Sequence, residues 1–249
     1  NLILSGLGLT GALIVGWGVM PPRSRLGKPD NMLSTDGDVA LNGWIKIAKD
    51  GSIVLAMHRS DMGQGIHNAL AMLVAEELDV SLKNVRLEQA GHDAIYGNVA
   101  MFVGTLPFHP MQSEGKDKPM MVKTGEWMVS KVARELGVNA TGGSSSVKDA
   151  WEHLRTAAAT AKASLLLSAA DQWKVPAKEL TVKDGVVSHA SGKSAHIGEL
   201  AKGAAAQTPS NVVLKDRKDW QLIGKATQRS DIPAKTNGSA VFGMDVRLP

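Results

Sequence analysis

The chain opens with a long apolar stretch, and the spacing of its hydrophobic residues then changes between the periods of strands and helices. Residues 2–20 carry no charged side chain, and Pro21 and Pro22 follow them. About 20 such residues can cross a bilayer as a helix, which proline then ends. The alternatives are a signal-peptide core and a buried core helix, but no clean small-x-small cleavage site precedes Pro21. We expect a membrane anchor or uncleaved export signal over residues 1–22.

A polar segment of residues 23–41 follows, with the glycine, proline and aspartate residues that are typical of turns. We interpret this segment as a linker. Residues 44–47 and 53–57 then show the composition and spacing of strands, with Asp50-Gly51 between them as a turn signal. The sequence therefore predicts an antiparallel hairpin directly after the linker.

Helical spacing begins at residues 66–78, where Leu70, Leu73, Val74 and Leu78 fall on or near one face. Further elements follow from the same patterns. They are a strand at 85–87, an irregular but packed segment at 90–123, helices at 125–136, 147–173 and 196–206, a hairpin of 180–182 with 186–188, and a strand-like tail at 220–249. This order of hairpin, helix, strand, long helix and hairpin predicts an α+β fold.

Composition narrows the chemistry that this chain can perform by itself. The 249 residues suggest one large domain or two smaller ones. The formal net charge of +4 comes without a dense block of lysine and arginine, so no nucleic-acid partner is indicated. The chain has no cysteine, which excludes disulfides and an iron–sulfur cluster held by this chain. Electrons from any redox reaction must therefore leave through another chain.

Two loops carry the candidate chemistry, and the first is Met62-Gly63-Gln64-Gly65, directly before the helix predicted at 66–78. The two glycines let the backbone approach a ligand closely, and the Gln64 amide can donate and accept hydrogen bonds. The helix that follows attracts anions to its N-terminus. A plain turn is the alternative interpretation of this loop.

The second loop runs from Thr141 through Gly142, Gly143, Ser144 and Ser145 to the helix predicted from Val147. Ser146 and Asp149 have the spacing of a capping box, which would fix the start of that helix. Backbone N–H groups and three hydroxyls then suit a phosphate or pyrophosphate. A flexible Ser/Gly connector is the alternative. Neither loop has the Gly-Lys-Ser/Thr of a P-loop or the third glycine of a dinucleotide-binding fingerprint.

Together with other stretches, these loops make the chain resemble the large subunits of the xanthine dehydrogenase and aldehyde oxidase superfamily. The type with the greatest likeness is the isoquinoline oxidoreductase β-subunit, which is also found among membrane-bound aldehyde and nicotinate dehydrogenases. The matching stretches are Arg59 to Gly65, Ala75-Glu76-Glu77-Leu78, Tyr96-Gly97-Asn98, Ala140 to Trp151, Ile223-Gly224-Lys225 and Arg229 to Lys235. They cover nearly all of the chain after the apolar stretch.

The resemblance implies a molybdenum cofactor, molybdopterin cytosine dinucleotide, held by layers of mixed sheet and helices. It assigns the cofactor contacts to both loops, namely Met62, Gly63, Gln64, Gly65, Gly142, Gly143, Ser144, Ser145 and Ser146. The catalytic glutamate of the family lies in a Gly-Glu motif near the end of a much longer chain. No residue here matches it, so the resemblance implies no catalytic residue and no protein ligand to the metal within this sequence.

The resemblance further implies that this chain is the N-terminal portion of a larger subunit. Residues 42–215 would form the cofactor-binding domain, and residues 216–249 would open the next, hammerhead-like domain. The full subunit would oxidise an aldehyde or an N-heterocycle and pass electrons to a small [2Fe-2S] subunit and a haem c cytochrome. Relatives carry twin-arginine export signals, so we expect an anchored protein on the periplasmic side of the bacterial inner membrane.

The rival hypothesis is a membrane-anchored scaffold or adaptor that keeps the fold without the cofactor. A generic nucleotide-binding protein is a third, weaker hypothesis. None of the seven histidines has metal-binding spacing, so we interpret them as structural, with His67 near the first loop as a candidate to support it. Glu76 and Glu77 are expected at the surface or as capping groups and not as a general base.

Overall fold

The computed structural model describes residues 24–32 and 37–248. The membrane anchor predicted over residues 1–22 lies outside these ranges. Among the described residues, no helix has the length and the apolar character needed to cross a membrane.

A four-stranded mixed sheet lies beside the predicted first loop. Its strands are β1 (Val39–Ala40), β2 (Ile45–Ile47), β3 (Ile53–Met57) and β4 (Val85–Gln89), in the order β1-β2-β3-β4. The first three strands are antiparallel, which confirms the predicted hairpin, and β4 pairs parallel to β3. A parallel pair needs a crossover, and α2 (Ile66–Leu78), which has the predicted bounds, provides it.

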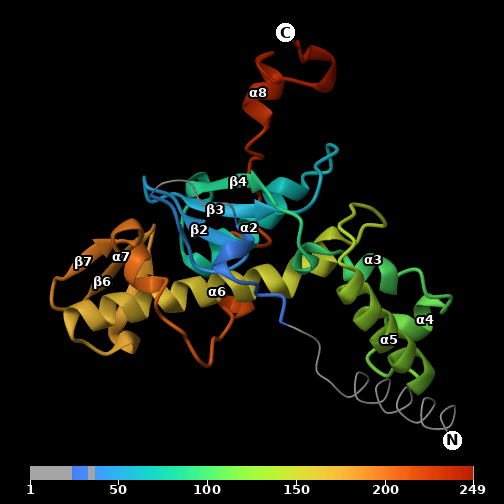
Figure 1. Cartoon of the computed structure of the whole chain (residues 1–249), viewed down its shortest axis with the longest axis horizontal. Coiled ribbons are helices and arrows are strands. Elements are labelled where there is room, and N and C mark those ends of the chain that lie inside the picture. The colour runs from blue at the N-terminus through green and yellow to red at the C-terminus, as the bar shows by residue number, and fades with distance from the viewer. Residues whose placement is uncertain (1–23, 33–36, 249) are drawn as a thin grey trace, which may run out of the picture.

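Two helices cover the sheet and enclose the core. α2 packs along α6 (Ser146–Trp173), a helix of 28 residues that runs beneath the four-stranded sheet (Figure 1). Leu70 and Val74 of α2 are fully buried, as are Ala157 and Ala158 of α6. The burial of Leu70 and Val74 confirms the predicted apolar face of α2. The small side chains on α6 let the two helices approach closely.

A second, three-stranded sheet lies at one end of α6, and it consists of β5 (Leu180–Lys183), β6 (Val186–His189) and β7 (Ser194–His196). All its pairs are antiparallel, and the predicted β5–β6 hairpin is confirmed. Its turn residues Asp184 and Gly185 have φ of 49° and 79°, as a type I′ turn requires. Strand β7 was not predicted. It ends at His196, which caps α7 (Ile197–Ala204).

Three helices lie at the other end of α6; the first two fall in the segment predicted to be irregular, and the third corresponds to the helix predicted at 125–136. They are α3 (Val99–Val103), α4 (Pro110–Ser113) and α5 (Met120–Leu136). Helix α5 begins five positions earlier than the predicted 125, because Gly125 does not interrupt it. A Cβ at position 125 would stand 3.1 Å from Phe108, so glycine makes room there for an aromatic ring. As predicted, α5 ends at Gly137, which has φ of 59°.

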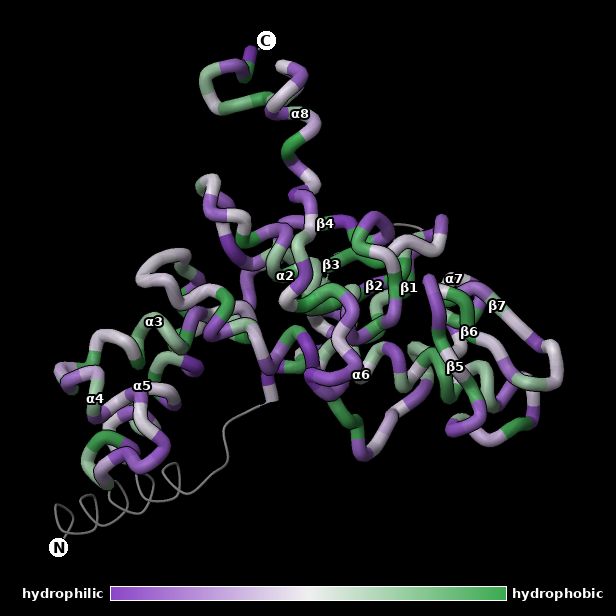
Figure 2. Tube along the Cα trace, turned by 180° about the vertical axis from the view of Figure 1, so that it is seen from behind, coloured by the Kyte–Doolittle hydropathy of each residue, from purple (hydrophilic) through white to green (hydrophobic). Residues whose placement is uncertain are grey.

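The strand-like pattern predicted for the tail at 220–249 is wrong for the residues that the structure describes. Residues 220–248 contain the short helix α8 (Ile232–Thr236), and the end of the chain projects away from the body (Figure 1). This projecting end carries exposed hydrophobic residues (Figure 2). Among the described residues, no strand lies beside this end, and an unpaired strand would leave its backbone groups unsatisfied.

The segment of residues 23–41 was predicted as a linker, but its described residues, 24–32 and 37–41, contribute to the packed body. Arg25 is buried, and β1 adds a strand to the edge of the four-stranded sheet. The remaining short 3-10 helices are Pro29–Asn31, Leu82–Asn84, Ala94–Tyr96, Ala177–Glu179, Arg217–Asp219 and Gly243–Asp245.

Candidate functional site

The two predicted loops, far apart in the sequence, border one groove with a volume of about 570 Å³. We call it the two-loop groove. Seven of the nine predicted residues line it, namely Met62, Gln64, Gly65, Gly142, Gly143, Ser144 and Ser146. The rest of the lining is Ile66, Ala69, Thr141 and Val147. The other two, Gly63 and Ser145, belong to the loops but not to the lining.

The first loop is held by an aspartate that directly precedes it. Asp61 Oδ1 accepts a hydrogen bond from the Gly63 N–H at 2.9 Å, and Oδ2 accepts one from the His67 N–H at 3.1 Å. Burial opposes ionisation, but these backbone donors lower the pKa of Asp61 below its ordinary value. The N-terminus of α2 therefore already holds an anion of the protein itself, and this changes the expected role of the first loop.

Gln64 stabilises the same loop from within. Its Nε2 donates to the Ser60 carbonyl oxygen at 3.0 Å, and its Oε1 accepts from the Met62 N–H. Gly63 and Gly65 have φ of 99° and 82°, a region in which side chains are strained. The loop thus has a fixed shape, with the Met62 side chain 72% exposed at the groove.

The second loop presents backbone donors. Gly143 and Ser144 have left-handed φ of 57° and 50°. Ser145 donates its hydroxyl to the Gly142 carbonyl oxygen at 2.7 Å and accepts from Asn98 Nδ2 at 2.8 Å. This hydroxyl makes no capping hydrogen bond to α6, and the first N–H groups of a helix have no acceptor within the helix. The start of α6 at Ser146 can therefore donate to an anion in the groove.

The capping box predicted for Ser146 and Asp149 is wrong. The N-cap is Ser145, and Ser146 is already the first residue of α6. Asp149 instead accepts hydrogen bonds from Arg25 and Arg59. A carboxylate stabilises two buried guanidinium groups more strongly than it stabilises a helix N-terminus, because an unpaired buried charge costs more free energy.

These three residues form a buried cluster, the arginine–aspartate cluster, which ties the two loops together. Arg59 lies three positions before the first loop, and its Nη2 lies 2.8 Å from Oδ2 of Asp149, which comes shortly after the second loop. Arg25 Nη2 lies 2.9 Å from the same oxygen. Burial raises the pKa of Asp149, but hydrogen bonding and attraction to Arg25 bring the net pKa below its ordinary value. Ser60 N–H also donates to Thr141 Oγ1 at 2.9 Å, which joins the loops directly.

The tail also contacts the first loop. Arg229 Nη1 donates to the Gly63 carbonyl oxygen at 2.8 Å, and its Nη2 pairs with Asp231 at 2.6 Å. Ser230 N–H donates to Asn68 Oδ1 on α2 at 3.3 Å. Residues from the C-terminal segment therefore support the loop from outside the groove.

The expectation that Glu76 and Glu77 lie at the surface is wrong, since both are buried. Glu77 Oε1 pairs with Arg155 at 2.7 Å. Glu76 accepts hydrogen bonds from Lys215 and from the backbone N–H groups of residues 221–223. The two carboxylates attach α6 and the tail to α2, and neither faces the groove.

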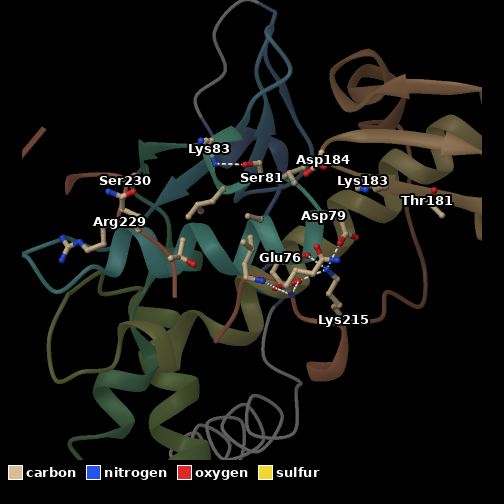
Figure 3. Close-up of a pocket in the computed structure, with 18 of the residues that line it drawn as sticks. Glu76, Asp79, Ser81, Lys83, Thr181, Lys183, Asp184, Lys215, Arg229 and Ser230 are labelled. Carbon is tan, nitrogen blue, oxygen red and sulfur yellow. Dashed lines mark hydrogen bonds and ion pairs between the residues drawn. The ribbon is translucent and has the colours of Figure 1, made fainter. Parts of the chain in front are cut away.

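A second cavity, about 860 Å³, is separate from the groove and lies between the end of α2, the β5–β6 hairpin and the tail (Figure 3). Two acidic groups of its lining are already paired, since Lys215 Nζ lies 2.7 Å from buried Glu76 and 2.6 Å from half-buried Asp79. These contacts fix the tail in place. Within the described ranges, no group of three or more His, Cys, Asp or Glu side chains is placed to hold a metal ion.

The histidines occupy structural positions. His67 Nε2 lies 2.9 Å from the Arg59 carbonyl oxygen, which places it behind the first loop as expected. His58 is buried, with its ring edge-on to Trp44 at 4.7 Å between centroids, and neither ring nitrogen has a hydrogen-bond partner. Burial lowers the pKa of His58 well below its ordinary value.

Comparison with known proteins identifies the family of this chain. Residues 10–100 match the family described as the molybdopterin cofactor-binding domain. The beta chain of the isoquinoline 1-oxidoreductase of Brevundimonas diminuta is 32% identical over 247 residues, which cover 85% of this chain and 27% of that protein. The membrane-bound aldehyde dehydrogenase of Gluconacetobacter polyoxogenes is 30% identical, covering 88% of this chain and 24% of that protein.

A nicotinate dehydrogenase subunit of Pseudomonas putida is 29% identical, covering 98% of this chain and 17% of that protein. The chain thus spans about a quarter or less of the length of these relatives. The solved structure of reconstituted CO dehydrogenase from Oligotropha carboxidovorans aligns with a TM-score of 0.39 and 19% identity, over 72% of this chain and 18% of that one. On the sequence relatives and the family match, the chain belongs to the molybdopterin-binding subunits of the xanthine dehydrogenase and aldehyde oxidase family.

Proposed function

We propose that this chain is the N-terminal part of a molybdenum hydroxylase large subunit, and that the two-loop groove holds molybdopterin cytosine dinucleotide. One observation carries the proposal. Two loops from distant parts of the sequence, each predicted to touch the cofactor, line the same groove. The arginine–aspartate cluster fixes their relative position.

The residues present fit a phosphate-bearing cofactor. A Cβ added at Gly143 would meet no atom of the described chain within 4 Å, so the backbone there borders open space. The hydroxyls of Ser144 and Ser146 and the first N–H groups of α6 are donors at the same edge. Asp61 caps α2, so we assign the phosphate contacts to the second loop and a wall of the groove to the first.

When bound, the cofactor supplies the redox chemistry that oxidises an aldehyde or an N-heterocycle. The contribution of this chain is to bind and orient that group. Gly143 and Ser144 shape the second loop, Ser146 and α6 donate hydrogen bonds, and Met62 and Gln64 border the pterin. Because the chain has no cysteine, electrons pass to iron–sulfur clusters and haem c on partner subunits.

The proposed location is the periplasmic side of the bacterial inner membrane, with residues 1–22 as the anchor. The apolar stretch of residues 2–20 supports this proposal. So does the description of one relative as membrane-bound.

A matched pair of glycine variants tests the proposal in the intact complex. Gly143→Ala adds a methyl group in the groove, and Gly192→Ala adds one in the β6–β7 turn. Both glycines have positive φ, 57° and 89°, and a Cβ at either meets no protein atom within 4 Å. The backbone cost of about 1 kcal/mol is therefore shared, and only Gly143→Ala should also obstruct the cofactor.

We expect Gly143→Ala to lower the molybdenum content per large subunit at least about tenfold relative to Gly192→Ala, equivalent to about 1.4 kcal/mol. Metal analysis by mass spectrometry and release of cytidine monophosphate by acid measure this content. Equal cofactor content in the two variants would contradict the placement of the cofactor against the second loop.

A further inference from the structure

Another pocket, distinct from the two-loop groove, lies between α3, α5 and the first turns of α6. Its volume is about 350 Å³, at the lower end of the range for small-molecule sites. We call it the α5 pocket. Its charged lining residues are Arg25, Lys131, Arg134, Lys148, Asp149 and Glu152.

The charges around this pocket are unbalanced. Four cationic side chains line it against two carboxylates. One of these carboxylates, Asp149, is already engaged by Arg25 and Arg59 in the arginine–aspartate cluster. The other, Glu152, is exposed. The pocket therefore keeps an excess of positive charge.

Two of the cations have no partner in the described part of the chain. Arg134 and Lys148 make no side-chain hydrogen bond or ion pair there, although Arg134 is half-buried. Burial and repulsion by Arg25 lower the pKa of Arg134 from its ordinary value, but a guanidinium stays charged at neutral pH. Burial also lowers the pKa of His153 to about 4, so that its ring is neutral at pH 7. A half-buried, unpaired guanidinium favours an anion at this place.

Four of the uncharged lining residues are apolar or aromatic. Val99 and Val103 of α3 face the pocket, as does Trp127 of α5. Lys131 Nζ lies 4.7 Å from the centre of the Trp127 ring. A flat or apolar body fits beside such a wall, while the planar fork of a guanidinium matches the two oxygens of a carboxylate.

We propose that the α5 pocket binds a carboxylate attached to an aromatic or apolar body, with Arg134 as its main anchor and Lys148 as a second cation. The carboxylate belongs to a small organic acid or to an acidic side chain of a partner protein. This site is independent of the cofactor groove, so its test does not depend on cofactor content.

Isothermal titration of the full chain with sodium benzoate tests the pocket, with benzamide as the neutral probe of the same shape. We expect benzoate to bind with a Kd of about 1 mM or tighter, and benzamide at least about tenfold more weakly. Arg134→Gln should weaken benzoate binding at least about tenfold. Glu152→Gln should strengthen it about twofold, because it removes a like charge.

Lys123→Gln is the matched control, since Lys123 is exposed on the same helix and does not line the pocket. It should bind benzoate as the unaltered chain does, and thermal unfolding will show whether each variant is folded. A blocked dipeptide, acetyl-Phe-Asp-amide, distinguishes the two sources of the carboxylate. Tighter binding of the dipeptide indicates a partner side chain, and tighter binding of benzoate indicates a free acid. Equal binding of benzamide, or benzoate affinity that Arg134→Gln leaves unchanged, would overturn the proposal.

Discussion

Replacing Asp149 by asparagine should destabilise the protein strongly, because this carboxylate is the shared partner of two buried guanidinium groups. Its side chain is 2% exposed, and those of Arg25 and Arg59 are 4% and 0% exposed. Asp149 also accepts a hydrogen bond from the Ala100 N–H at 3.1 Å. Asparagine keeps the shape but removes the negative charge, so both arginines lose their counter-ion.

Breaking a buried ion pair by removing one partner costs about 3–5 kcal/mol. A domain of ordinary stability has a free energy of unfolding of about 5–15 kcal/mol, so the loss is a large fraction of the whole. Urea unfolding followed by circular dichroism measures it, and the slope of the transition should stay unchanged.

The matched control lies on the same helix. Asp171 pairs with Lys174 at 2.9 Å, but its side chain is 71% exposed, and exposed pairs contribute about 0–1 kcal/mol. Asp171→Asn should therefore leave the free energy of unfolding almost unchanged. The reasoning is refuted if Asp149→Asn costs less than about 1 kcal/mol, or no more than Asp171→Asn does.

Asp149 should also make the free energy of unfolding fall at acidic pH. Because the folded-state pKa of Asp149 is lowered, its contribution is fully present above the unfolded pKa of about 4 and is lost as pH falls through the folded value. Three further predictions concern other side chains. Glu76→Gln should release the tail and cost about 2–3 kcal/mol, seen as faster proteolysis between residues 216 and 230; unchanged cleavage would count against this role. His58→Phe removes two unpaired buried nitrogens and should raise stability by about 1 kcal/mol at pH 8. The gain should be larger at pH 5, since the lowered pKa of His58 costs stability as pH falls below the unfolded value of about 6.5; an equal gain in urea at both pH values would refute that cause. Gln64→Ala should loosen the first loop, which hydrogen exchange at Met62 will reveal, and should weaken cofactor retention; normal molybdenum content would contradict it.

The sequence alone predicted those elements whose signals are local. The bounds of α2 and the β5–β6 hairpin, with its turn at Asp184-Gly185, follow from side-chain spacing and turn chemistry. The second loop was correctly identified as the segment leading into the long helix. What the pattern could not show is that this loop would meet the first one across a groove, because that proximity depends on how α2 packs against α6.

The predictions that failed for charged residues have a common physical cause. A charged residue is buried only where an oppositely charged partner lies beside it, and the sequence does not show which residues become neighbours. Arg25 lies in a segment that has the composition of a linker, yet its guanidinium reaches Asp149 across the fold. Glu76 and Glu77 have the polarity of surface residues, yet each is buried against a cation. Asn98 was noted within a family stretch, but its bond to Ser145 required the folded chain.

The tail was predicted wrongly for a related reason. A strand-like pattern of apolar residues predicts a strand, but a strand must also pair with the edge of a sheet. In the described part of the chain, no sheet edge lies beside residues 240–248. The contact of Arg229 with Gly63 shows instead that the tail supports the first loop before it leaves the body.

The most direct test of the central claim is the cofactor content of the intact complex that contains this chain. Molybdenum and acid-released cytidine monophosphate, measured on the same purified sample, should each approach about one per large subunit, as expected for one groove in each chain. Absence of both from a correctly folded complex would contradict the proposed cofactor site and favour a scaffold that retains the fold without the cofactor.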